Sequence, residues 1–118
     1  MAATSDQIKK IVALENAADS LRAEGKYNEA IASLLQALEI DDKFVRAHLA
    51  LGVLYHLIGD YDQAVRHSER AVELEPGDSF NVAALSVTYQ RALAATGDMR
   101  FKEKAEEMLY RNQGRPRH

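Results

Sequence analysis

The sequence predicts an all-α protein built from three tandem helix–turn–helix units. Only six glycines and two prolines interrupt its 118 residues, and the helix-favouring residues alanine and leucine are abundant. Small and apolar residues recur at intervals of three and four, which places them on one face of a helix. A stretch of about 34 residues also occurs more than once. We therefore expect helices at residues 5–24, 27–40, 44–58, 61–75, 79–96 and 99–112.

The repeat is clearest around two glycines in the first and second units. Gly25 and Gly59 lie 34 residues apart, and each is followed two residues later by a tyrosine, Tyr27 or Tyr61. The runs GKYNEAI and GDYDQAV are similar, with the same glycine, tyrosine and alanine positions. Glycine suits the left-handed conformation that ends many helices, so each glycine marks the turn inside its unit.

The later helices have their own boundary signals. Asp60 and Gln63 have the spacing of a capping box, which begins the helix at 61–75, and Pro76 ends it. In the third unit the turn glycine, Gly97, comes 38 residues after Gly59. The four additional residues lengthen the first helix of this unit, 79–96, by about one turn.

A helix–turn–helix unit of this length resembles the tetratricopeptide repeat, in its small three-repeat, bacterial-type form. The second unit has His48 where that family prefers tryptophan and Ser68 where it prefers an aromatic residue. The resemblance implies a right-handed superhelix, or α-solenoid. We expect one repeat domain at 5–112, with units at about 11–44, 45–78 and 79–112, and a disordered basic tail at 113–118. The matching small, apolar, aromatic and proline positions are Leu51, Gly52, Tyr55, Ala64, Ala71 and Pro76.

The composition excludes several classes of partner. A net charge of −3 and a pI of about 5.8 argue against a nucleic-acid partner. No uncharged stretch approaches the ~20 residues of a membrane span, and the polar segment 1–10 does not resemble a signal peptide. Cysteine is absent, which fits a reducing compartment. We expect a cytoplasmic protein with no membrane or nucleic-acid partner.

The family resemblance implies an adaptor that binds a peptide or helix of a partner protein in a concave groove formed by the first helices. The floor of this groove is expected to be apolar, with Glu15 and Asp19 at one end and Arg46, His56 and Arg91 near the other. It suits an amphipathic helix or an extended apolar segment whose basic residue meets the acidic end. Alternatively, the apolar residues only pack neighbouring first helices together. The expected groove residues are Glu15, Asp19, Arg46, Leu49, Val53, His56, Phe80, Ala83, Val87 and Gln90.

A carboxylate clamp is the family's best-known binding chemistry. In the clamp, lysine, asparagine and arginine side chains hold the C-terminal carboxylate of a heat-shock chaperone. The aligned positions here carry apolar or acidic residues, so we expect no clamp and no co-chaperone role of that kind. These positions are Glu15, Asp19, Ala50, Phe80 and Ala84.

The C-terminal end of the array provides an alternative function. Members of this family usually end in an additional polar helix, which is not visible after residue 112. Met108, Leu109 and Tyr110 are then candidates for exposure and for contact between copies, which would make the protein a self-assembling scaffold. An acidic segment at 1–90 (14 acidic and 8 basic residues) and a basic one at 91–118 (4 and 7) fit head-to-tail contact. Alternatively, the lengthened helix at 79–96 covers this end itself.

The sequence contains no convincing catalytic or metal-binding motif. His48 and His56 are eight residues apart, about 12 Å along a helix, which is too far for one ion. His67 lies on a different predicted helix, and adjacent His67 and Ser68 diverge too far to act as base and nucleophile. No phosphate-binding loop is present. We expect no metal, no cofactor and no enzymatic activity.

Overall fold

The computed structural model describes residues 3–112, apart from the side chain of Asn112, and contains helices and no strand within this range. Each helix boundary lies within one residue of its predicted position, so the all-α prediction is confirmed. The predicted basic tail at 113–118 lies outside the described residues. The helices are α1 (Ser5–Ala23), α2 (Tyr27–Ile40), α3 (Val45–Leu57), α4 (Tyr61–Leu74), α5 (Ser79–Thr96) and α6 (Met99–Asn112).

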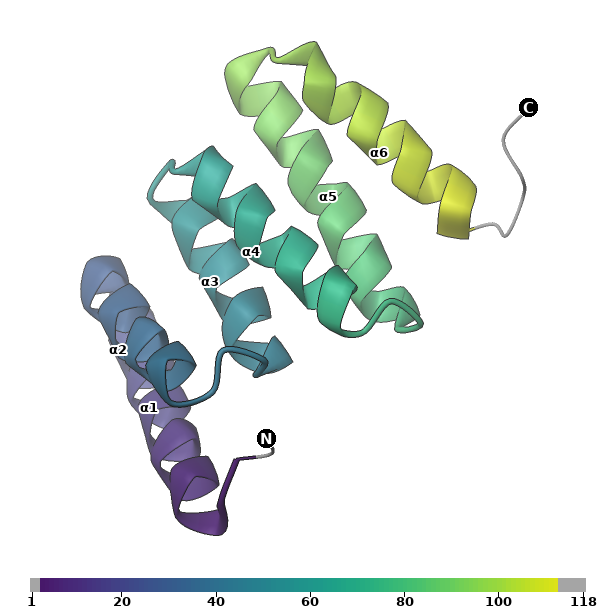
Figure 1. The fold of residues 1–118 in the computed structure, drawn as a ribbon. Coiled ribbons are helices and arrows are strands. Elements are labelled where there is room, and N and C mark those ends of the chain that lie inside the picture. The colour runs from purple at the N-terminus through teal and green to yellow at the C-terminus, as the bar shows by residue number, and fades with distance from the viewer. Residues whose placement is uncertain (1–2, 113–118) are drawn as a thin grey trace.

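The helices form three antiparallel pairs, α1–α2, α3–α4 and α5–α6, which stack side by side into an elongated array (Figure 1). Each helix packs mainly against its neighbours in the chain, and α3 also touches α5. The molecule measures 48 × 32 × 18 Å. This arrangement of pairs, without a central helix or sheet, is an α-solenoid.

Tight turns join the two helices of each pair. Gly25 and Gly59, which follow α1 and α3, have φ angles of 78° and 82°. This left-handed conformation costs other residues energy because their Cβ meets the backbone. The Asp60 side chain accepts a hydrogen bond from the Gln63 backbone N–H and begins α4. The glycines therefore act as the sequence predicts, and Asp60 forms the N-cap hydrogen bond of the expected capping box.

Two apolar clusters stabilise the array. The N-terminal core lies among α1, α2 and α3, and the C-terminal core lies among α4, α5 and α6. The buried residues of the N-terminal core are Ala18, Ala30, Ile31, Leu34, Ala47, Leu51 and Leu54. Those of the C-terminal core are Val65, Val82, Leu85, Tyr89, Ala92, Phe101, Ala105 and Met108.

Small residues fill the interface between α3 and α4, which lies between the two cores. Gly52, Ala64, Ser68 and Ala71 are all buried there. A Cβ atom built on Gly52 would lie 2.6 Å from Ser68 Oγ. The two helices therefore approach closely, and their positions fix the floor of the site described below.

Candidate functional site

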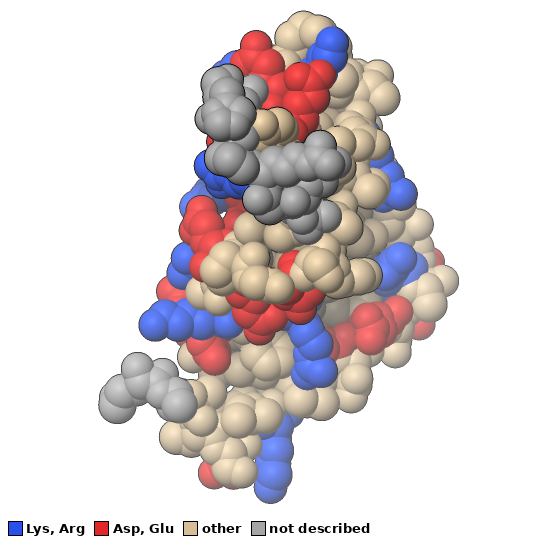
Figure 2. Space-filling model, turned by 90° about the vertical axis from the view of Figure 1, so that its right-hand side faces the viewer, with Lys and Arg blue, Asp and Glu red and all other residues tan. Residues whose placement is uncertain are grey.

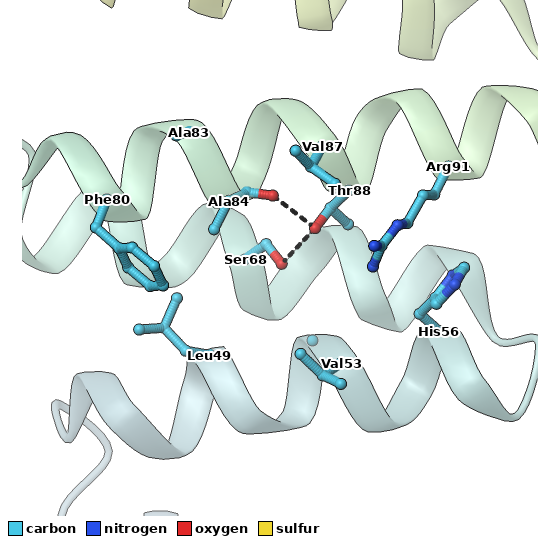
Figure 3. Close-up of a pocket in the computed structure, with 11 residues that line it drawn as sticks. Leu49, Val53, His56, Ser68, Phe80, Ala83, Ala84, Val87, Thr88 and Arg91 are labelled. Atoms are coloured by element: carbon cyan, nitrogen blue, oxygen red, sulfur yellow. Dashed lines mark hydrogen bonds between the residues drawn. The ribbon is translucent and has the colours of Figure 1, made fainter.

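A groove of about 320 Å³ lies between α3 and α5, with α4 beneath it (Figure 3). The residues that line it come from all three helices and are mostly small or apolar. They are Leu49, Gly52, Val53, His56, Ser68, Phe80, Ala83, Ala84, Val87, Thr88 and Arg91.

Helical spacing explains why these residues meet. Phe80, Ala84, Val87 and Arg91 recur at intervals of three and four along α5, so one face of this helix borders the groove. Figure 3 shows Phe80 above Leu49 at one end of the groove. At the other end, Arg91 from α5 and His56 from α3 approach each other.

The apolar groove residues are unusually accessible. Phe80 is 70% exposed, and Val53 and Val87 are also exposed. The structure therefore leaves a row of large apolar side chains only partly covered by neighbouring helices. A contiguous apolar surface of this kind is typical of a binding site.

Six of the ten predicted groove residues line this one groove: Leu49, Val53, His56, Phe80, Ala83 and Val87. Arg91, which the sequence predicts near the basic end, lines the groove together with His56. Gln90 is exposed on α5 but does not border the groove.

The charged end of the predicted groove is arranged differently from the prediction. Arg46 Nη2 lies 3.0 Å from Glu15 Oε1, so the ion pair connects α3 to α1. The prediction that Arg46 and Glu15 lie at opposite ends is therefore wrong, because the long arginine side chain reaches back to the preceding unit. Asp19 borders a separate shallow depression with Arg22 and Leu57.

The end of the third unit is also better covered than predicted. Met108 is 9% exposed and belongs to the C-terminal core, so its predicted exposure is wrong. It joins Phe101 and Ala105 on the face of α6 that packs against the lengthened α5. Leu109 remains 46% exposed, and Tyr110 is half-buried.

The outer face of α6 carries charged residues where the inner units carry apolar ones. In α2 and α4, the residue after the buried alanine, Ala30 or Ala64, is apolar. These residues, Ile31 and Val65, are covered by the next unit. Lys102 follows the corresponding buried Phe101 and forms an ion pair with Glu106. Figure 2 views the molecule from the side on which α6 lies in Figure 1 and shows acidic and basic side chains mixed over it. This face has the polar character of a terminal cap.

A histidine pair that was not predicted from the sequence connects α3 to α4. His48 Nδ1 lies 3.0 Å from His67 Nδ1, and His48 Nε2 lies 2.7 Å from the Asp42 carbonyl oxygen. Because a carbonyl oxygen only accepts, His48 Nε2 carries a proton and donates it. In the neutral pair, His67 Nδ1–H therefore donates to His48 Nδ1. The Tyr55 ring stacks on His67 with centroids 5.5 Å apart.

The histidine pair predicts a pH-dependent stability. Burial, aided by positive charge at His48 and Arg66, lowers the pKa of His67 from 6.5 to about 4. Between these two pH values the unfolded chain binds a proton that the folded chain does not. The free energy of unfolding is therefore highest above pH 6.5 and decreases progressively as the pH falls from 6.5 to 4. We expect a loss of about 1 kcal/mol at pH 5, less than the full shift implies because solvent screens the half-buried ring.

Urea unfolding at pH 7.5 and pH 5 checks this expectation, with His67→Gln as the comparison. The variant should be less stable at pH 7.5 but should lose less stability on acidification. An equal loss in both proteins would contradict the assignment to His67.

Within residues 3–112, no group of three or more histidine, aspartate and glutamate side chains is arranged to hold a metal ion. No helix in that part of the chain is long and apolar enough to span a membrane.

Comparison with known proteins gives matches to repeat proteins. A family model described as TPR repeat matches residues 18–59, and one described as tetratricopeptide repeat matches residues 45–78. Human DnaJ homolog subfamily C member 7 is 37% identical over 60 residues, which is 51% of this chain. The matched part is only 12% of the length of that relative.

Two solved structures share the fold. The first TPR domain of Spaghetti (RPAP3), bound to the HSP90 peptide SRMEEVD, has a TM-score of 0.63 at 14% identity and covers 87% of this chain and 95% of its own. The Sgt2 TPR domain from Aspergillus fumigatus has a TM-score of 0.63 at 20% identity, and the match covers 99% of this chain and 89% of that domain. The two family models together span residues 18–78, and the six-helix array continues the same pattern to α6. The chain belongs to the tetratricopeptide repeat family.

Proposed function

We propose that this protein is an adaptor that binds a segment of a partner protein in the groove between α3 and α5. The observation that carries the proposal is the row of exposed apolar side chains beside an open groove, above all Phe80. Repeat proteins of this family act through protein–protein contacts, and apolar side chains of a partner would bury this surface. The proposal includes a cytoplasmic location, supported by the absence of cysteine, and action by binding rather than catalysis.

The proposed binding mode is not a carboxylate clamp. Among the clamp-aligned positions, Glu15 is paired with Arg46, Asp19 is acidic, and Phe80 is apolar. Acidic side chains would repel a terminal carboxylate. The Spaghetti (RPAP3) domain was solved with an HSP90 peptide, but its 14% identity supports a shared fold and not a shared ligand.

The alternative, a self-assembling scaffold that contacts other copies through the third unit, receives less support. The outer face of α6 carries Lys102 and Glu106 at positions where a stacked unit would need apolar contacts. Met99 and Leu109 are large apolar side chains of α6 that are exposed, at 56% and 46%. Assembly through α6 would therefore bury charged groups at a cost in free energy.

Capture from a lysate of the source organism tests the groove. We expect Val53→Glu or Phe80→Glu to reduce the captured partner at least tenfold, because each places a charge where an apolar side chain should bind. Helicity and melting temperature should change little, since both side chains are exposed. Circular dichroism and quantitative mass spectrometry measure the two effects.

Leu109→Glu is the matched control, since it makes the same kind of change at an exposed apolar side chain outside the groove. It should leave capture unchanged. Loss of capture with Leu109→Glu, but not with the groove variants, would contradict the groove and move the partner-binding site to α6.

A further inference from the structure

Arg91 gives the groove a chemical preference at one end. We propose that the bound segment combines apolar side chains with an aspartate or glutamate, whose carboxylate binds the Arg91 guanidinium. This inference rests on the proposed function and specifies its ligand. The bound carboxylate belongs to a side chain within the segment, and it lies outside the positions aligned with the clamp.

The groove has an unmatched positive charge. Arg91 lines it beside His56, and no acidic residue is among its lining residues. Among the described residues, Arg91 forms no hydrogen bond or ion pair with a carboxylate. Four other arginines already have such partners: Arg46, Arg70, Arg100 and Arg111. The charge of Arg91 is therefore available to a ligand.

The sequence predicts the opposite charge preference, in which a basic residue of the partner meets an acidic end of the groove. The structure does not support this preference. Glu15 is occupied by Arg46 at 3.0 Å, and its side chain is only 18% exposed. Asp19 borders a different depression. Charge complementarity at the groove itself therefore favours an acidic ligand, although the whole chain has a net charge of −3.

The groove also sets a spacing between the apolar and acidic groups of the ligand. Phe80 and Arg91 are eleven positions apart on α5, which corresponds to about 16 Å along the helix. An extended segment covers that distance with about five residues, and a helix covers it with about eleven. In a ligand whose apolar residue contacts Phe80 and Leu49, the residue that reaches Arg91 is therefore about five positions away if the ligand is extended and about eleven if it is helical.

Selection from a phage library of random peptides of about 12 residues tests the charge preference. The immobilised targets are the full wild-type chain and its Arg91→Glu variant. Peptides selected by the wild type should carry aspartate or glutamate at a fixed distance from apolar residues. The variant should select lysine or arginine at the same place, and wild-type peptides should bind it about tenfold more weakly.

An exchange of charges provides the decisive measurement. Replacing the selected acidic residue of a synthetic peptide with lysine should weaken binding to the wild type and restore binding to Arg91→Glu. Arg66→Glu is the control, because it changes the net charge equally on an exposed α4 residue that does not line the groove. It should bind the original peptide as the wild type does.

The outcomes separate this inference from the proposed function. If Phe80→Glu abolishes peptide binding while Arg91→Glu changes neither affinity nor selected sequence, the groove is correct and the acidic ligand is wrong. If peptides bind wild type, Phe80→Glu and Val53→Glu equally, or if no peptide is selected, both proposals fail. If Arg66→Glu weakens binding as much as Arg91→Glu, the effect reflects overall charge and overturns the inference.

Discussion

Leu51→Ala should reduce the free energy of unfolding by about 3 kcal/mol, because it removes a large side chain from a site with no room to collapse. Leu51 is 0% exposed and lies in the N-terminal core, between α3 and the first helix pair. The lost methyl groups leave a cavity, which adds to the cost of reduced apolar burial. Urea unfolding followed by circular dichroism measures the change.

Leu109→Ala makes the identical substitution at a side chain that is 46% exposed, and should cost less than about 0.5 kcal/mol. Similar losses for the two variants would contradict the placement of α3 against α1 and α2.

The region of the molecule that Leu51→Ala destabilises can also be tested. Units of a solenoid contact only their neighbours, and the N-terminal and C-terminal cores have no buried member in common. In Leu51→Ala, amide hydrogen exchange should therefore accelerate more in α1, α2 and α3 than in α5 and α6. Uniform acceleration along the chain would mean that the two cores unfold as one unit.

The helices could be predicted because their signals are local. Gly25 and Gly59 occupy left-handed positions that few other residues tolerate, and the Asp60 carboxylate accepts a hydrogen bond from the Gln63 backbone N–H in the first turn of α4. Because the first two units repeat after 34 residues, the same turn glycine and following tyrosine can be recognised in both. The groove positions on α3 and α5 followed from helical spacing, which is why Val53, Phe80 and Val87 border one groove.

Contacts between long or polar side chains of different units could not be predicted in this way. Arg46 reaches Glu15 across 31 residues of sequence, and its direction depends on the rotation of α1 relative to α3. His48 and His67 meet across α3 and α4 because small residues let those helices approach. The burial of Met108 depends on how α6 packs against the lengthened α5. A helical pattern specifies which face is buried, but not which polar atoms meet across an interface.

The effect of Gly52→Ala on the free energy of unfolding should change sign when Ser68 is replaced by alanine. In the wild type the new Cβ would lie 2.6 Å from Ser68 Oγ, so the hydroxyl must leave its contact with Thr88 Oγ1 at 3.3 Å or the helices must separate. We expect this strain to exceed the ~1 kcal/mol that alanine contributes over glycine inside a helix. The net result should be a loss of about 1 kcal/mol.

With Ser68→Ala the obstructing oxygen is removed, and the next atom, the Ala64 carbonyl oxygen, lies 3.5 Å from the new Cβ, an ordinary contact. Gly52→Ala should then stabilise the protein by about 0.5–1 kcal/mol through helix propensity alone. Urea unfolding of the wild type, both single variants and the double variant gives the coupling energy, expected to be about 2 kcal/mol. An unchanged effect of Gly52→Ala in the two backgrounds would show that α3 and α4 are further apart. Because Gly52 and Ser68 also line the groove, the same close approach determines how deeply a ligand side chain can enter it.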